Sequence, residues 1–421
     1  MPSGFFVVEY PRRNGSEENN MNRKIIFTGI LISALAPGIM AEEAVKTPPP
    51  AAGANAIAFS FYSKEAAKPG NVFFSPYSIR TAFAMAYTGA RGKTKEEIAS
   101  VSSFPAQPGD LRDSQNALKQ ALAEASKGAE FKQANSFWAQ EGYPFLGTYI
   151  KSLRANYGAE ANQVDFKAKT EEAREKINSW TAKETKGKIK DLFPKGALNP
   201  LSRLVLVNAV YFKGTWLESF SRDMTADADF TKTDGEKVKV KMMASPGTRN
   251  AGYAENEELQ ALRLPYKGGS LSMLVLLPRE GKTLADIEKG LTAEKLEALR
   301  GGLQKEKVKV FLPRFTFKTG YRLNDALAEL GMPAAFTEGA ADFSAMDGTN
   351  KLYIQTAFHK AFVEVNEEGT EAAAATGIAM GVKSMPMAML RFRADRPFLF
   401  FIEDAKSGLI LFMGRLEEPK E

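Results

Sequence analysis

The chain contains no cysteine and a single histidine, His359, among its 421 residues. Without cysteine there is no disulfide framework, no zinc site with thiolate ligands and no cysteine nucleophile. Any catalytic triad would have to use His359, and no Gly-x-Ser-x-Gly motif accompanies it. Its apolar neighbours favour a buried structural histidine. We therefore expect a protein that is not an enzyme and that uses no metal and no other cofactor.

The charge balance is mildly basic. Lysine and arginine number 56 and aspartate and glutamate 50, which gives a formal net charge of +6. Both signs are interspersed along the chain, so the excess predicts mild steering of acidic partners and no nucleic-acid groove. A mean hydropathy of -0.27 excludes a protein with many membrane spans.

Residues 21–41 have the pattern of a secretory signal peptide. Two basic residues precede an apolar run over residues 25–36, which is shorter than the roughly 20 residues that a membrane-spanning helix needs. Because Met21 starts this pattern, we interpret residues 1–20 as an extension from an upstream start codon. We expect no membrane span and a secreted, extracellular or periplasmic protein.

Residues 42–54 are rich in proline and alanine and predict a stiff linker. The remainder, residues 55–421, contains no repeat and no second linker and predicts one domain. Within it, Ser75 followed by Pro76 predicts the start of a helix. The apolar stretch 204–212 predicts a strand buried on both faces.

Two turns indicate hairpins in the second half of the chain. Lys-Gly-Gly-Ser at residues 267–270 separates two apolar runs, and residues 404–408 separate two more. Helical patterns dominate the first half and strand patterns the second. The sequence therefore predicts an α+β fold, with helices packed on large, mainly antiparallel sheets.

Two other motifs have structural explanations. Residues 89–94 resemble a phosphate-binding loop, but that spacing would require glycine in place of Tyr87. The end of one helix and the capping box of the next, at Thr94 and Glu97, explain them instead. Lysines alternate over residues 237–241 and predict one solvated strand face.

The segment 367–389 does not fit a passive globule. It begins with Glu-Glu-Gly-Thr-Glu and continues with four alanines at residues 372–375. Read with period 2 from Thr370, one face carries small and apolar side chains that could be buried. Alanine also has the highest helix propensity, so a capped helix remains an alternative. In extended form, these side chains are small enough to enter between existing strands.

This segment resembles the hinge of the reactive loop of an inhibitory serpin. The matching residues are Glu367, Glu368, Gly369, Thr370, Glu371, Ala372, Ala373, Ala374, Ala375 and Thr376. The resemblance extends over most of residues 55–419. It includes Asn-Val-Phe-Phe-Ser-Pro-Tyr-Ser at 71–78, Val-Asn-Ala-Val-Tyr-Phe-Lys-Gly-Thr-Trp at 207–216, Phe-His-Lys-Ala at 358–361 and Arg-Pro-Phe-Leu-Phe at 396–400. The chain resembles a secreted bacterial serpin.

The resemblance implies a metastable serpin fold with three β-sheets, eight to nine helices and an exposed reactive-centre loop at about residues 367–395. In this family a protease cleaves the loop and forms an acyl-enzyme, and the cleaved loop then inserts as a new strand into the central sheet. Carried onto this chain, the scissile bond falls between Lys383 and Ser384. Insertion would begin with Thr370.

Two further groups of residues follow from the resemblance. The family's shutter, a hydrogen-bonded cluster beneath the strands that must part, matches Ser75, Ser78, Asn208 and His359. The breach, where the loop first enters, matches Trp216 and Arg314. We expect Glu367 to pair with Arg314 at a partly exposed hinge.

A lysine before the scissile bond implies a trypsin-like serine protease as the partner. Because of Val382 and Met380, cleavage one register away by an elastase-like enzyme remains an alternative. Cysteine proteases are a further target class. We expect a monomeric protease inhibitor that acts as a suicide substrate. The alternative is a non-inhibitory serpin-fold carrier, chaperone or storage protein, against which the four alanines of the hinge argue.

Overall fold

Helices dominate the first part of the chain. The computed structural model describes residues 49–105, 108–370 and 389–420 of the whole sequence. The helices are α1 (Pro49–Ala66), α2 (Pro76–Gly89), α3 (Gly92–Ser102), α4 (Pro108–Ala125), α5 (Gly147–Tyr157) and α6 (Thr170–Glu184). Between them lie the strands β1 (Val72–Phe74), β2 (Ala129–Gln140) and β3 (Glu160–Val164). As predicted, Ser75 caps α2: its hydroxyl accepts a hydrogen bond from the Ser78 amide.

Strands dominate the second part. They are β4 (Leu204–Thr215), β5 (Ser221–Thr231), β6 (Lys237–Ala244), β7 (Arg249–Glu255), β8 (Leu259–Pro265), β9 (Leu271–Pro278), β10 (Gln304–Pro313), β11 (Phe315–Arg322), β12 (Thr356–Asn366), β13 (Gly369–Thr370), β14 (Leu390–Arg393), β15 (Phe398–Asp404) and β16 (Ile410–Leu416). Short helices connect some of them: α7 (Leu284–Glu288), α8 (Ala293–Gly301), α9 (Leu323–Glu329), the 3-10 helix η1 (Ala334–Phe336) and α10 (Ser344–Asp347). The α+β fold is confirmed.

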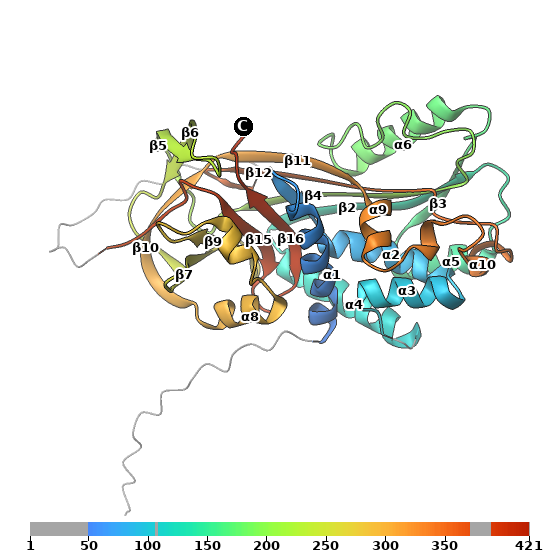
Figure 1. The fold of residues 1–421 in the computed structure, drawn as a ribbon, viewed down its shortest axis with the longest axis horizontal. Coiled ribbons are helices and arrows are strands. Elements are labelled where there is room, and N and C mark those ends of the chain that lie inside the picture. Colours follow the sequence, from blue (N-terminus) through green and yellow to red (C-terminus); the bar gives the residue numbers. More distant parts are fainter. Residues whose placement is uncertain (1–48, 106–107, 371–388, 421) are drawn as a thin grey trace, which may run out of the picture. The chain divides into compact units, whose positions relative to one another are not determined.

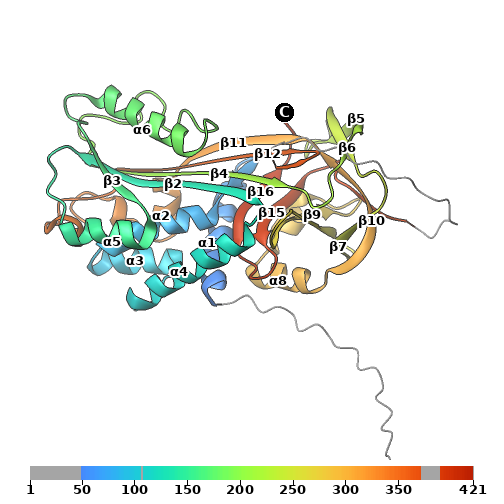
Figure 2. The ribbon, with the colours of Figure 1, turned by 180° about the vertical axis from the view of Figure 1, so that it is seen from behind.

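One sheet has the strand order β11-β12-β13-β4-β2-β3. Figures 1 and 2 show α6 on one face of this sheet and α2 on the other. Alternate residues of β4 serve the two faces: Leu204 and Leu206 share a core cluster with α2, while Val205 and Val207 share one with α6. This arrangement explains why β4 is apolar throughout and confirms the predicted strand buried on both faces.

The other strands form one hydrogen-bonded path, β1-β16-β15-β9-β8-β7-β10-β6-β5, with β14 paired to β10. The described residues thus form two connected sets of strands where three sheets were expected. The strand β10 makes the connection, because it pairs with β7 over Gln304–Val308 and with β6 over its last residues. The predicted hairpins join β8 to β9 and β15 to β16.

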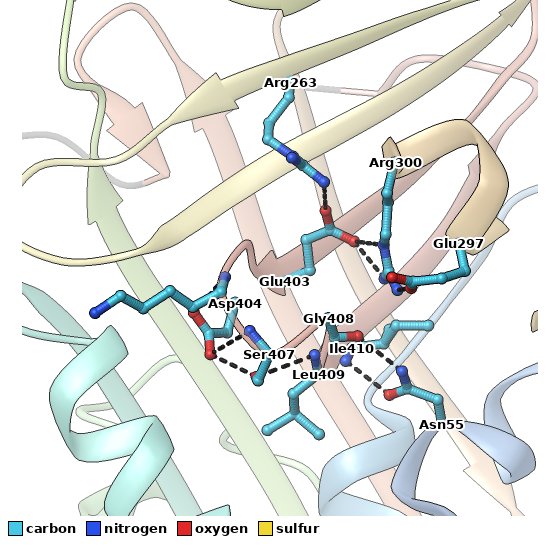
Figure 3. Close-up of polar contacts among 11 residues, drawn as sticks. Asn55, Arg263, Glu297, Arg300, Glu403, Asp404, Ser407, Gly408, Leu409 and Ile410 are labelled. Carbon is cyan, nitrogen blue, oxygen red and sulfur yellow. Dashed lines mark hydrogen bonds and ion pairs between the residues drawn. The ribbon is translucent and has the colours of Figure 1, made fainter. Parts of the chain in front are cut away.

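Polar contacts at the β15–β16 turn anchor two helices to this second sheet (Figure 3). Glu403 is fully buried and accepts hydrogen bonds of 3.0 Å from Arg263 of β8 and from Nε of Arg300 of α8. Asn55 of α1 donates to the Gly408 carbonyl at 2.7 Å and accepts from the Ile410 amide at 2.8 Å. These bonds tie the first described helix to the last hairpin.

The structure corrects two local predictions. The expected linker does not reach residue 54, because α1 begins at Pro49 and its Ala51 and Ala54 are buried in the core. Alanine is small and helix-favouring, so an alanine-rich run packs as readily as it links. The expected capping box is also wrong. Helix α3 begins at Gly92, so Thr94 lies inside it and accepts a hydrogen bond from the Asp342 amide.

The alternating lysines of β6 face solvent, as predicted. Lys237, Lys239 and Lys241 are exposed, and the last two pair with Asp229 and Asp227 of β5. Residues 89–94 span the end of α2 and the start of α3, so the helix-boundary explanation of this motif is confirmed. Among the described helices, we find none that is both long enough and apolar enough to cross a membrane.

Candidate functional site

The short strand β13 carries Thr370 into the first sheet. Thr370 pairs in antiparallel register with Val365 of β12 on one side and with Gly214 of β4 on the other. Its side chain is fully buried, and its hydroxyl is hydrogen-bonded to the Tyr266 phenol at 2.8 Å. Further along, β12 and β4 pair directly with each other in parallel register, from Thr356 to Phe362 on β12. The two strands are therefore separated only where β13 lies between them.

Two glycines permit this close approach. Gly369 has a φ of +153°, and a Cβ on it would lie 1.9 Å from the Gly214 carbonyl oxygen. A Cβ on Gly214 would lie 2.7 Å from the Phe212 ring and 2.8 Å from the Tyr266 ring. Both positions therefore require glycine while β13 lies between its neighbours.

Trp216 lies at the end of β4 and holds the residues before β13. It is fully buried, and its indole stacks on Tyr266 with ring centroids 4.6 Å apart. The indole nitrogen donates to the Asn366 carbonyl, and the Trp216 amide donates to the Glu368 carbonyl, both at 2.9 Å. Trp216 thus contacts the segment at the position that the family resemblance gave for loop entry.

The expected pair between Glu367 and Arg314 is present. Arg314 Nε donates to both carboxylate oxygens of Glu367, at 2.8 and 2.9 Å. Burial alone would raise the pKa of Glu367, but the hydrogen bonds from Arg314 and Thr225 outweigh it and hold the pKa below its usual value. Glu368 pairs in turn with Arg222.

The hinge residues 367–370 are buried, which corrects the expectation of a partly exposed hinge. Glu367 is 3% exposed and Glu368 is 6% exposed, although Arg314 and Arg222 reach solvent. The expectation underestimated burial because it treated the whole segment as surface loop. The chain after Trp216 covers the segment instead, and its Phe220 amide donates to the Glu367 carbonyl at 2.8 Å.

The four residues that match the shutter form one buried hydrogen-bonded cluster. Ser78 donates its amide proton to Ser75 Oγ at 3.1 Å, and Asn208 Nδ2 donates to Ser78 Oγ at 2.7 Å. His359 accepts the Ser75 amide proton on Nε2 at 3.0 Å, and its Nδ1 contacts Asn208 Oδ1. All four side chains are fully buried. The cluster joins α2 to β4 and β12, which pair directly at this level of the sheet.

This geometry assigns one tautomer to His359. Because Asn208 Oδ1 is an acceptor, Nδ1 of the imidazole carries the proton and Nε2 accepts from Ser75. A second ring proton would point at the Ser75 amide, which is itself a donor. Burial lowers the pKa of His359 to about 3, so the ring is neutral at physiological pH. Both ring nitrogens are occupied by the Ser75 amide and the Asn208 side chain, which gives His359 a structural hydrogen-bonding role.

Two polar residues of β2 complete the cluster and were not predicted. Gln133 Nε2 donates to Ser78 Oγ at 3.0 Å, and Asn135 Oδ1 accepts from Asn208. They lie on the strand face that also carries Phe131 and Phe137, both of which contact other aromatic rings. Two amides between aromatic residues at period 2 were the available signal, because a core-facing strand position is normally apolar.

The predicted scissile bond and most of the predicted hinge lie outside the described residues. These are Lys383 and Ser384, together with Glu371, Ala372, Ala373, Ala374, Ala375 and Thr376. The chain is described again from Met389, and β14 follows at once.

Comparisons with known proteins place the chain in a family. Residues 52–419 match the family described as Serpin (serine protease inhibitor). An uncharacterized serpin-like protein of Thermococcus kodakarensis is 41% identical over 87% of this chain and 85% of its own length. Leukocyte elastase inhibitor A of Mus musculus is 40% identical over 84% of this chain and 95% of its own length.

The fold comparison includes a protein whose name describes ligand binding. The crystal structure of human thyroxine-binding globulin in complex with thyroxine superposes with a TM-score of 0.80 at 27% identity, covering 88% of this chain and 99% of the other. The family match covers nearly all described residues, the relatives are close, and the strand β13 enters the sheet at Thr370. The chain therefore belongs to the serpin family of serine protease inhibitors.

Proposed function

We propose that this protein inhibits serine proteases as a suicide substrate, with cleavage between Lys383 and Ser384. The observation that carries the proposal is the position of Thr370. The first residue of the inserting segment is already buried between β12 and β4, with its backbone in register and its hydroxyl bonded to Tyr266. After Glu371 the sequence continues with four alanines, whose side chains are small enough to enter between the two strands.

The proposed mechanism couples cleavage to strand insertion. The serine of the protease attacks the Lys383 carbonyl, the Ser384 amine leaves, and an acyl-enzyme remains attached through Lys383. The fourteen residues from Thr370 to Lys383 then form a strand of about 45 Å. This movement carries the protease along the sheet and distorts its oxyanion hole. Since the loss of one oxyanion donor costs about 100- to 1000-fold in rate, deacylation stalls.

The cluster of Ser75, Ser78, Asn208 and His359 lies where insertion must separate β12 from β4. Parting these strands breaks buried hydrogen bonds, and each group left unpaired costs about 1–3 kcal/mol. Asn208 and His359 lie on the two strands themselves and face each other. We infer that this cluster keeps the sheet closed until the cleaved loop supplies new partners.

Lys383 favours trypsin-like enzymes, whose specificity pocket carries a carboxylate. Elastase-like or cysteine proteases are alternative targets under the same mechanism. The signal-like pattern of residues 21–41 supports action outside the cell or in the periplasm. We propose that the inhibitor acts as a monomer.

A non-inhibitory role is the competing proposal, and the likeness to thyroxine-binding globulin favours testing it. The protein is incubated with trypsin and analysed on a denaturing gel. We expect a covalent complex that survives boiling in detergent and a released peptide that begins at Ser384. If the chain is cleaved while trypsin keeps full activity, the inhibitory function is wrong. A catalytically inactive trypsin, which cannot acylate, is the control.

A further inference from the structure

Five cations form a continuous stripe on the outer face of two neighbouring strands. On β10, buried Val308, Val310 and Leu312 alternate with outward-facing positions, and Lys305, Lys307 and Lys309 occupy three of those. On β14, Phe392 is buried and its two neighbours are arginines. We call the set Lys305, Lys307, Lys309, Arg391 and Arg393 the basic stripe.

The pairing of the strands makes the stripe continuous. In the parallel register Lys309 lies opposite Arg391, and Phe311 lies opposite Arg393. The Phe311 ring binds these cations: its centroid is 4.7 Å from the Arg391 guanidinium, 5.1 Å from that of Arg393 and 5.9 Å from Lys309 Nζ. The aromatic ring therefore holds three like charges together on one surface.

The stripe has little compensating negative charge. Among the five residues of the basic stripe, only Arg393 has a carboxylate of the described residues within 4.0 Å of its charged nitrogens. This carboxylate belongs to Asp395, at 3.0 Å. On the other side of β10 lies β7, where Lys305 is paired with Gly252 and Lys307 with Asn250, both uncharged. Burial, and then repulsion from Arg249, lower the pKa of Lys309. Clustered cations with few acidic partners raise the local positive potential.

Chain connectivity places any bound protease close to this surface. Ser384, on one side of the proposed scissile bond, is six residues from Leu390, where β14 begins. Six extended residues span at most about 22 Å. A protease domain of about 200 residues has a radius of gyration of about 16 Å. A protease engaged at the loop therefore lies within contact range of the stripe.

We propose that the basic stripe is a docking surface for an acidic patch on the target protease, and that it steers the association of the two proteins. This inference rests on the proposed function, because it assumes that the loop is the bait. The stripe selects among proteases with the same primary specificity, since Lys383 alone cannot distinguish one trypsin-like enzyme from another.

The test compares two triple variants with the same net charge. K305E/K307E/R391E reverses the stripe, and K151E/K167E/K176E reverses three exposed lysines of α5, α6 and the connection before α6. These elements lie at the opposite end of the first sheet from β10 in Figures 1 and 2. Each variant changes the formal net charge from +6 to 0. Rates of complex formation are measured with an anionic and a cationic trypsin isoform, from 25 to about 300 mM NaCl.

With the anionic isoform at low salt, we expect reversal of the stripe to slow association about tenfold and to flatten its dependence on salt. We expect the control triple variant to change the rate by less than about twofold. The yield of covalent complex should be the same in all three proteins. Equal slowing by both triple variants would show that only net charge matters and would overturn the proposal. If charge reversal impairs folding, the test is repeated with the neutral variant K305Q/K307Q.

Two further outcomes separate this proposal from its alternatives. If no protease forms a covalent complex, kcat/KM for loop cleavage by the two isoforms is compared instead, so docking is tested even if inhibition fails. Binding to immobilised heparin is also measured. If the stripe variant loses heparin binding but reacts with both isoforms at wild-type rates, the stripe is a site for polyanions and the proposal is wrong.

Discussion

Thr370 and Tyr266 are joined by a hydrogen bond of 2.8 Å between two fully buried side chains. Burial raises the pKa of the Tyr266 phenol, so it remains protonated. Thr370, with which the proposed insertion begins, is thus accommodated in the intact protein, in a site that satisfies its hydroxyl. Under the proposed mechanism, the barrier to further insertion lies beyond Thr370, where β12 and β4 still pair directly.

We expect Thr370→Arg to convert the inhibitor into a substrate. A guanidinium cannot enter this site unpaired, so insertion becomes slower than deacylation. The loop is still cleaved at Lys383, because that residue is unchanged. The measurement is the ratio of covalent complex to cleaved product on a denaturing gel. Thr370→Ser, which keeps the hydroxyl, is the matched control and should retain inhibition.

Lys383→Ala should abolish inhibition of trypsin-like enzymes without changing the fold. If the side chain has no packing role, its loss should shift stability by less than about 0.5 kcal/mol. Lys383→Arg should preserve inhibition, since trypsin-like enzymes accept either cation. Inhibition kinetics and thermal melts of the three proteins test this prediction. Arg391 and Arg393 are poor alternative bait residues, because both are paired with β10 in β14.

Cleavage at Lys383 should raise the melting temperature far above that of the intact protein. An inserted strand adds a ladder of backbone hydrogen bonds and relieves a state that is held kinetically. Melting curves of intact and cleaved wild-type protein, and of both forms of Thr370→Arg, provide the comparison. Equal midpoints for the two wild-type forms would mean that the loop does not insert and would favour a non-inhibitory role.

Removing the partner of Glu367 should release the hinge. In Arg314→Met the buried carboxylate loses its two hydrogen bonds from the guanidinium, so withdrawal of β13 into water becomes more favourable. The chain has no cysteine, so Thr370→Cys supplies a unique thiol. We expect that thiol to react at least about tenfold faster with a labelling reagent when Arg314→Met is added.

The matched control for this experiment is Arg222→Met in the same Thr370→Cys background. Arg222 pairs with Glu368 but is 63% exposed, so its loss should increase labelling much less. Equal labelling rates with and without Arg314→Met would show that the Glu367–Arg314 pair does not hold the hinge.

The buried His359 should make the intact protein less stable as the pH falls below about 6.5. Its pKa is about 3 in the folded protein, below the value of 6.5 in an unfolded chain. The unfolded state therefore gains a proton first, and the stabilisation present above pH 6.5 is lost on acidification. The maximal slope is about 1.4 kcal/mol per pH unit. Melting between pH 7 and 5, above the titration of most carboxylates, measures it.

His359→Gln removes this titration while keeping an acceptor near the Ser75 amide. We expect the variant to melt lower than wild type at pH 7 but to depend less on pH between 7 and 5. Parallel pH profiles for the two proteins would assign the acid sensitivity to other groups.

The sequence predicted elements whose signals are local. Ser75 and Pro76 identified the start of α2, and the apolar run of β4 and both hairpins were recognisable from periodicity and turn residues. Local signals failed at α1, because an alanine-rich stretch is compatible with both a linker and a helix. They also failed at Thr94, because its hydroxyl accepts a hydrogen bond from the distant Asp342 amide. Tertiary contacts decided both cases.

The candidate site was predictable in its residue types and not in its arrangement. Asn208 and His359 followed from family motifs, but the contact of Gln133 and Asn135 with this cluster depends on the pairing of β2 with β4, which their period-2 pattern alone does not give. The burial of Glu367 depended on the covering segment around Phe220, which no short motif indicates. Lys309, Arg391 and Arg393 share the Phe311 ring only because β14 pairs in parallel register with β10, and this register joins residues 82 positions apart in the chain, such as Lys309 and Arg391.

The aromatic stack at the hinge also gives the protein a built-in optical probe. Of the three tryptophans, Trp138 and Trp180 contact each other, with ring centroids 5.8 Å apart. Trp216 instead stacks on Tyr266 and donates a hydrogen bond to the Asn366 carbonyl beside the hinge. With Trp138 and Trp180 replaced by phenylalanine, all indole emission would come from Trp216. Its spectrum would then follow movement of the hinge in real time, without any chemical label.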